Sequence, residues 1–277
     1  MLDFSLRREL SLHAEVAADV TTALDAMGIS GIVVGAFARD LHLHYEAGIP
    51  AQRATEDIDF AFAVRSWDEF SGLRERLVNA GSFKTVEGTP QRLRHRSTLS
   101  VDLVPFGNIE NDDRRIAWPP GGDIVMDVFG FSESFSGAEK VLMPGNVKIS
   151  IVGLPALALL KIIAWDDRHR RFPGKDAADL NLILRSYLAV PRNQERLWSD
   201  FAEWAGSPDF DYELSGARML GHDIRDLVDT KGLTKVDEIL RKQLDAGELP
   251  QQMQRQAPKH ALALLKSLHA GLSADRA

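Results

Sequence analysis

The 277-residue sequence contains no cysteine. This absence excludes disulfide bonds, zinc sites with thiolate ligands and cysteine nucleophiles. It is typical of proteins of the reducing cytoplasm, where we expect this chain to reside.

Long apolar runs are also missing. A membrane-spanning helix needs about 20 consecutive apolar residues, and the longest apolar stretch, residues 152–164, is interrupted by Gly153, Pro155 and Lys161. The N-terminal residues MLDFSLRR lack the basic start and apolar stretch of a secretory signal. We therefore expect a folded protein without a membrane partner.

Positive charge is scarce, since 33 Lys and Arg stand against 40 Asp and Glu and the net charge is −7. Nucleic-acid binding regardless of sequence needs a basic surface that releases counterions, so the charge argues against that class. Two basic clusters, at residues 92–96 and 168–171, leave an RNA substrate open. Taken alone, either cluster is interpreted as solvated charge on loops and strand edges.

Hydrophobic spacing divides the chain into a mixed front part and a helical back part. Strands are expected at 31–34, 57–64, 83–87, 92–96, 99–106, 124–129 and 147–152, with a loop at 107–123. Helices are expected at 6–27, 36–45, 66–80, 155–166, 175–188, 193–205, 216–228, 236–244 and 254–272. The change of character near Ile151 predicts an α/β domain over residues 1–150 and an all-helical domain over residues 151–277.

The strand expected at 57–64 begins with Asp57-Ile-Asp59. Side chains two residues apart on a strand point to the same face, with Cα atoms roughly 6–7 Å apart. Two ionised carboxylates repel each other, so a cation is expected between them. Mg²⁺ suits this place because it prefers oxygen ligands and keeps positions open for phosphates. The alternative is an edge strand whose polar face is only solvated, and the pair alone leaves both interpretations open.

Two further features surround this pair. Gly31-Ile-Val-Val-Gly35 is a strand that runs into a glycine, with a helix beginning at once. Such a turn presents backbone N–H groups and a helix N-terminus to an anion, which suits a triphosphate. A third acid, Asp102, stands between apolar residues in the strand expected at 99–106.

This order of elements resembles the DNA-polymerase-β-type nucleotidyltransferase superfamily. The resemblance implies an α/β (α+β) fold with a mixed sheet, flanking helices and a two-metal Mg²⁺ site. In that family the first two acids, here Asp57 and Asp59, bind both metals, while the third, here Asp102, binds one and helps to activate the attacking hydroxyl. In-line phosphoryl transfer needs metal ions to neutralise the phosphates and align the nucleophile.

The glycine turn departs from the family pattern. The family usually has Gly-Ser or Gly-Gly there, whereas this chain has Gly35-Ala36, which keeps the backbone amides and lacks the hydroxyl that touches a phosphate. The stretch from Gly35 to Asp40 is also similar to the Gly-Gly-x-x-Arg-Asp stretch of tRNA-terminal transferases. It implies that Arg39 contacts a phosphate, and the alternative is a surface ion pair with a neighbouring acid.

A second group of motifs lies downstream. Lys161-Ile-Ile-Ala, Arg168 and Lys-Asp176-Ala-Ala-Asp179-Leu resemble the Lys-x-x-Ala, Arg and Lys-Asp-x-x-Asp-Leu signature of the AbiEii/MenT-type nucleotidyltransferases. These proteins include toxins of type IV toxin–antitoxin and abortive-infection systems. The resemblance spans about residues 30 to 185.

The roles of these downstream residues follow from the resemblance. Burying an unpaired charge is costly, so Lys161 either snorkels at the helix edge or, as the family implies, approaches the nucleotide phosphates. Asp176 and Asp179 share one helical face. Asp176 is alternatively a helix N-terminal acid, and the resemblance implies that at least one of the two lines the site, by contacting the nucleotide or by fixing Lys161 and Arg168.

Together the motifs predict Mg²⁺-dependent transfer of a nucleoside monophosphate from an NTP to an acceptor hydroxyl. The acceptor is a tRNA 3′ end, which the resemblance implies, a protein side chain or a small molecule such as an aminoglycoside. The resemblance also implies a cognate antitoxin as a partner. The alternative is a catalytically inactive nucleotide-binding or regulatory protein of the same fold, for which the missing serine at position 36 is the main argument. A metal phosphohydrolase ranks last, because no histidine stands near the acids.

Overall fold

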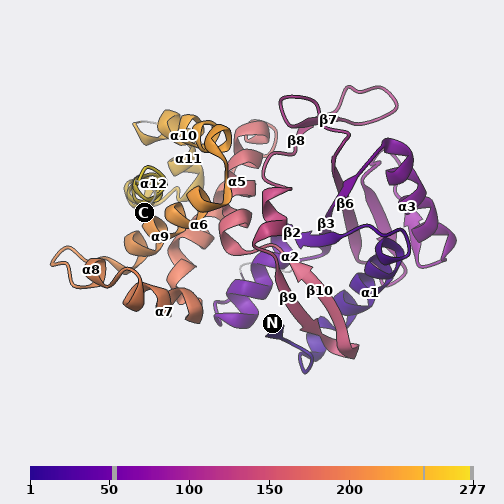
Figure 1. The fold of residues 1–277 in the computed structure, drawn as a ribbon, viewed down its shortest axis with the longest axis horizontal. Coiled ribbons are helices and arrows are strands. Elements are labelled where there is room, and N and C mark those ends of the chain that lie inside the picture. The colour runs from indigo at the N-terminus through magenta and orange to yellow at the C-terminus, as the bar shows by residue number, and fades with distance from the viewer. Residues whose placement is uncertain (52–54, 246, 275–277) are drawn as a thin grey trace. The chain divides into compact units, whose positions relative to one another are not determined.

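A computed structural model describes residues 1–51, 55–245 and 247–274. The chain forms two compact units, one made of Met1–Leu41 and Ala51–Gly153 and the other of His42–Pro50 and Leu154–Ala277. The first is a mixed α/β unit and the second is helical (Figure 1). The predicted fold class is therefore confirmed.

An eight-stranded mixed sheet forms the centre of the first unit, in the order β1-β9-β10-β2-β3-β6-β5-β4. Its strands are β1 (Leu2–Asp3), β2 (Gly31–Val34), β3 (Asp57–Val64), β4 (Phe83–Thr85), β5 (Arg92–His95), β6 (Ser100–Gly107), β9 (Glu139–Met143) and β10 (Val147–Ile151). The central strand β3 pairs antiparallel with β2 and parallel with β6. This arrangement places the predicted acidic strand in the middle of the sheet.

The helices of this unit explain which face of β3 is buried. They are α1 (Ser11–Asp25), α2 (Gly35–Asp40), α3 (Trp67–Asn79) and the short α4 (Glu133–Ser136). Helix α3 begins after the predicted N-cap Ser66, whose side chain accepts a hydrogen bond from the helix backbone. Phe70 of α3 stacks on Phe62 of β3 with ring centroids 6.3 Å apart. Because side chains alternate along a strand, Asp57 and Asp59 point to the face opposite α3.

The second unit packs helices around α9 and α12. Its helices are α5 (Leu154–Arg168), α6 (Lys175–Ser186), α7 (Pro191–Ser199), α8 (Ala202–Ala205), α9 (Tyr212–Leu227), α10 (Thr230–Leu244), α11 (Glu248–Met253) and α12 (Pro258–Leu272). A glycine on each helix allows α9 and α12 to approach closely, since a Cβ on Gly271 would lie 1.9 Å from the carbonyl oxygen of Arg218. Within the described residues, no helix is long and apolar enough to cross a membrane.

The short segment His42–Pro50 groups with the second unit, which the sequence did not predict. The predicted helix at 36–45 is α2 followed by a π-helical turn, Leu41–Glu46. Arg192 of α7 forms an ion pair with Glu46, and one of its nitrogens lies 3.3 Å from His42 Nδ1. These contacts join the π-helical turn to the helices of the second unit.

Several expected boundaries were wrong for identifiable reasons. Helices α9 and α10 begin earlier than predicted because Asp211 and Asp229 cap them, each accepting a hydrogen bond from a first-turn amide. The helix expected at 193–205 is divided into α7 and α8. The loop expected at 107–123 contains strand β7 (Arg115–Ala117), which pairs with β8 (Val125–Asp127) in a separate two-stranded sheet. Strands β1 and β9 were not expected at all.

Candidate active site

Strand register brings the three predicted acids to one face of the sheet. The parallel pairing of β3 with β6 places Asp59 opposite Asp102. The antiparallel pairing of β2 with β3 places Asp59 opposite Val34, the last residue before α2. Side chains opposite each other on neighbouring strands share a face, with Cβ atoms about 5 Å apart. Asp57, Asp59 and Asp102 are each half-buried there.

Gly35 lets one of these acids lie against the turn between β2 and α2. Its φ is +73°, a conformation that glycine adopts at little cost. A Cβ at this position would lie 1.9 Å from Asp59 Oδ2 and 2.8 Å from its Cγ. Both the backbone angle and the close carboxylate therefore require glycine. Ala36, which follows, is partly exposed at the start of α2.

Arg92 of β5 occupies the same face, and it is a site residue that the sequence did not predict. β5 pairs antiparallel with β6, so Arg92 lies opposite Asp102. Its Nε and Nη2 donate to the two Asp102 oxygens over 2.7 and 2.6 Å, and Nη2 also donates to Asp57 Oδ2 over 3.2 Å. The hydrogen bonds and charge of Asp102, with the charge of Asp57, raise the pKa of the Arg92 guanidinium further above its ordinary value.

The Arg92 guanidinium joins the carboxylates of Asp57 and Asp102, whereas a cation between Asp57 and Asp59 stays a prediction. Three carboxylates facing one guanidinium still leave an excess of negative charge. Their oxygen donors suit a hard cation such as Mg²⁺. Among the residues that the structure describes, however, no three acidic or histidine side chains are already grouped as metal ligands. Asp57, Asp59 and Asp102 fit a divalent cation in donor type and shared face, while Arg92 bonds to two of them.

Arg39 is buried rather than on the surface. Only 3% of the residue is exposed, and its Nε donates to Asp40 Oδ1 over 2.9 Å. Thr55 Oγ1 donates to the other Asp40 oxygen over 2.5 Å. The expected pairing with a neighbouring acid is present, but its expected surface location was wrong, because Phe37 to Asp40 are all buried in α2. A phosphate contact of Arg39 stays a prediction.

The second unit brings the downstream motif residues together. Lys161 of α5 lies 2.6 Å from Asp179 Oδ2 and 3.2 Å from Asp176 Oδ1. Arg168 Nε and Nη2 each donate to Asp176 over 2.8 Å. Burial opposes ionisation of Asp176, yet hydrogen bonds from Arg168 and the charge of Lys161 outweigh it and lower the pKa of this carboxyl. Burial likewise opposes the Lys161 charge, and the two carboxylates outweigh it and raise the pKa of the amine.

These contacts exclude one of the two alternatives for Lys161. Its side chain is only 8% exposed and paired with two acids, so it does not snorkel to solvent. Asp176 contacts both Lys161 and Arg168, as one of the alternatives for this acid expected. Nucleotide contacts of Lys161, Asp176 and Asp179 stay predictions.

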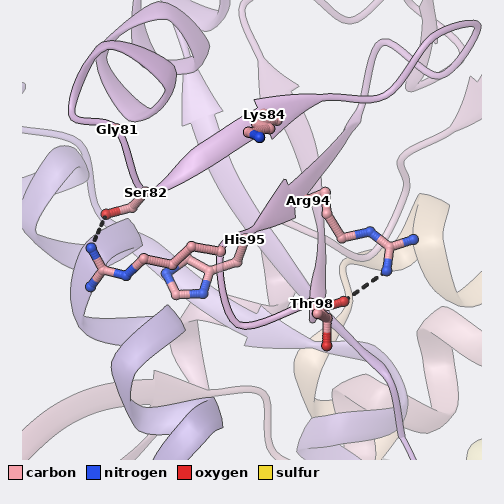
Figure 2. Close-up of a pocket in the computed structure, with 7 residues that line it drawn as sticks. Gly81, Ser82, Lys84, Arg94, His95 and Thr98 are labelled. Atoms are coloured by element: carbon pink, nitrogen blue, oxygen red, sulfur yellow. Dashed lines mark hydrogen bonds between the residues drawn. The ribbon is translucent and has the colours of Figure 1, made fainter.

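In the basic cluster at 92–96, Arg94 and Arg96 are exposed, as expected for solvated charge, although both also have hydrogen-bond partners. His95 is buried and its Nε2 lies 3.1 Å from Asp19 Oδ2. Arg96 forms an ion pair with Glu15 over 2.7 Å. Arg94 donates to the carbonyl oxygen of Thr98 over 2.8 Å, as Figure 2 shows.

A cavity of about 370 Å³ lies at the hairpin of β4 and β5. Its lining residues are Gly81, Ser82, Lys84, Arg94, His95, Arg96 and Thr98 (Figure 2). None of the predicted site residues lines it. The cavity therefore lies at the sheet edge, and the three strand acids are not part of its lining.

Comparison with solved structures finds distant matches to nucleotidyltransferases. The antibiotic-resistance factor ANT(2'')-Ia has 15% identity, with 70% of this chain and 96% of that chain covered and a TM-score of 0.41. An antigenic nucleotidyltransferase-like protein from Paracoccidioides brasiliensis has 15% identity, 70% and 91% coverage and a TM-score of 0.41. The Thermotoga maritima CCA-adding enzyme complexed with tRNA has 12% identity, 97% and 80% coverage and a TM-score of 0.25.

No curated protein matches the sequence. A family model does match, over residues 30–269, and it describes the nucleotidyl transferase AbiEii toxin of type IV toxin–antitoxin systems. The match includes the glycine turn, the three strand acids and the downstream Lys161 cluster. The chain belongs to the AbiEii nucleotidyltransferase toxin family.

Proposed function

We propose that this protein transfers a nucleoside monophosphate from an NTP to an acceptor hydroxyl in a Mg²⁺-dependent reaction. The observation that carries the proposal is the convergence of Asp57, Asp59 and Asp102 on one sheet face beside the Gly35 turn. Membership of a nucleotidyltransferase toxin family supports the same reaction class. Three carboxylates on one face repel one another, so a site for cations explains them better than a solvated strand edge does.

The chain's own residues supply positioning and proton transfer. When bound, Mg²⁺ neutralises the phosphate charge and aligns the reacting groups, with Asp57, Asp59 and Asp102 as its ligands. The backbone N–H groups at the start of α2 would bind the triphosphate, and Ala36 leaves these donors available. The acceptor oxygen attacks the α-phosphorus, the bond from that phosphorus to the bridging oxygen breaks, and pyrophosphate leaves. The hydroxyl proton passes to Asp102.

Three acceptors remain in the proposal: a tRNA 3′ end, a protein side chain and a small molecule. The basic residues of the β4–β5 hairpin favour an RNA, whereas the net charge of −7 favours a cationic small molecule. Family membership supports a cognate antitoxin as a partner.

A second candidate is a nucleotide-binding protein without turnover. Two observations favour it: alanine replaces the usual serine at position 36, and Arg92 already bonds to two of the three carboxylates. This candidate predicts NTP binding with no product.

The test uses each of the four NTPs with a labelled α-phosphate, Mg²⁺, and separately total tRNA, a protein extract or an aminoglycoside. We expect label on one acceptor class with wild type, none with Asp59→Asn, and wild-type transfer with Asp112→Asn, which removes an exposed loop acid. A parallel reaction with γ-labelled NTP should release labelled pyrophosphate and leave the acceptor unlabelled. Metal-dependent NTP binding without any transfer would support the second candidate.

A further inference from the structure

We propose that Arg92 is a built-in counterion that couples metal binding to NTP binding. This inference rests on the proposed function and assigns a role to a side chain outside the acidic motifs. Without nucleotide, the guanidinium holds the carboxylates of Asp57 and Asp102. With nucleotide, it moves to the triphosphate and releases both carboxylates to the divalent cation.

The geometry supports the first of these states. Arg92 makes a two-pronged contact with Asp102 over 2.7 and 2.6 Å and reaches Asp57 over 3.2 Å. Such paired, charge-assisted hydrogen bonds are among the stronger polar contacts in proteins. The contacts are fixed by strand register, because Arg92 lies directly opposite Asp102. The guanidinium therefore relieves the repulsion between the carboxylates.

The divalent cation and the Arg92 guanidinium compete because they bind the same carboxylate oxygens. A divalent cation at this face needs the same oxygens of Asp57 and Asp102 that the guanidinium holds. It would also meet the positive charge of Arg92 at short range. We therefore expect weak metal binding in the absence of nucleotide.

The NTP changes this balance by offering a second anion. An arginine fork matches phosphate as well as it matches carboxylate. The Arg92 side chain is 35% exposed, so one side of it is open for a move toward a phosphate. The NTP then raises the affinity for the divalent cation, and the cation raises the affinity for the NTP by the same factor, because coupling between two binding sites is reciprocal.

Arg94 provides a matched control. It lies two residues along β5, so its side chain leaves the strand on the same face as that of Arg92. Its guanidinium donates to the Thr98 carbonyl oxygen instead of a carboxylate (Figure 2). Arg94→Gln therefore removes one positive charge from the same strand and leaves the carboxylate contacts in place.

The experiment measures Mn²⁺ affinity by electron paramagnetic resonance, with and without a non-hydrolysable NTP analogue. For wild type and Arg94→Gln we expect the analogue to tighten Mn²⁺ binding by at least about tenfold, within the usual range of coupling between sites. For Arg92→Gln we expect tight Mn²⁺ binding from the start and less than about threefold further gain. In EDTA, Arg92→Gln should unfold at a lower urea concentration than Arg94→Gln. Adding Mn²⁺ should raise the unfolding midpoint of Arg92→Gln to that of Arg94→Gln.

The outcomes separate the two proposals. If Arg92→Gln binds Mn²⁺ no tighter than wild type and keeps the coupling, the role of Arg92 is refuted while the metal site stands. If wild type binds no Mn²⁺ with or without the analogue, the proposed function fails and the role of Arg92 fails with it. Should Arg92→Gln not fold, Arg92→Lys keeps the charge without the fork; reduced coupling supports the inference and unchanged coupling overturns it.

Discussion

Replacing Gly35 with alanine should damage the site in two separable ways. The residue has a φ of +73°, and an added Cβ would lie 1.9 Å from Asp59 Oδ2. The first defect is backbone strain, which affects stability. The second is a steric clash with a proposed metal ligand, which affects chemistry.

The structure sets the size of each defect. A left-handed backbone angle costs a non-glycine residue roughly 1–2 kcal/mol. Non-bonded contacts of a Cβ atom under 3.0 Å are essentially never seen. The Asp59 carboxylate must therefore move until its Oδ2, now 1.9 Å from the added Cβ, is at least 3.0 Å away. Displacing a catalytic group by about 1 Å costs on the order of a hundredfold in rate. We therefore expect a modest loss of stability and at least about a hundredfold loss of transfer.

Gly28→Ala isolates the first defect from the second. Gly28 has a φ of +67°, and its added Cβ would meet nothing within 4 Å. Urea unfolding should show similar destabilisation of both variants, while only Gly35→Ala should lose label transfer and Mn²⁺ affinity. Transfer by Gly35→Ala at the level of Gly28→Ala would refute the reasoning.

Two further predictions concern buried charge. Lys161→Met leaves the carboxylates of Asp176 and Asp179 without their ammonium partner, so the free energy of unfolding, measured in urea, should fall by about 3–5 kcal/mol; a loss below about 1 kcal/mol would contradict this. His13 stacks on Phe37, and its burial lowers the pKa of its imidazole below the ordinary 6.5. The unfolded chain therefore binds this proton more readily, so stability should be full above about pH 6.5 and fall toward pH 5, by less than about 1.4 kcal/mol per pH unit. In His13→Gln this part of the pH dependence should disappear, and an unchanged slope would show that another group causes it.

The sequence predicted the central strands well because their signals are local. β2 and β3 have the predicted bounds, since Gly35 ends the apolar run of β2 and Asp57 marks the start of β3. The Ser66 cap also formed as expected, because the serine and the acids after it mark a helix start. The family motifs then linked the strand acids to one reaction class, and the register of β3 with β6 brought Asp59 and Asp102 together.

The missed features depend on partners that are distant in the sequence. The sequence marked Arg92 only as part of a basic cluster. It pairs with Asp102 through the antiparallel register of β5 against β6, and neither segment alone predicts that register. β9 was missed because its pairing with β10 and β1 defines it as a strand. The early starts of α9 and α10 were hidden by Gly216 and Gly232, which weaken a helical pattern near its first turns.

Diffraction from crystals grown with Mn²⁺ and a non-hydrolysable NTP analogue tests the central claim most directly. We predict an anomalous peak about 2.0–2.2 Å from carboxylate oxygens of Asp57 and Asp59, a distance close to that of Mg²⁺ to its oxygen ligands. The Arg92 guanidinium should have left Asp57 in that state. A complex that contains the nucleotide but has no peak at these acids, with Arg92 still bonded to Asp57 and Asp102, would contradict the account.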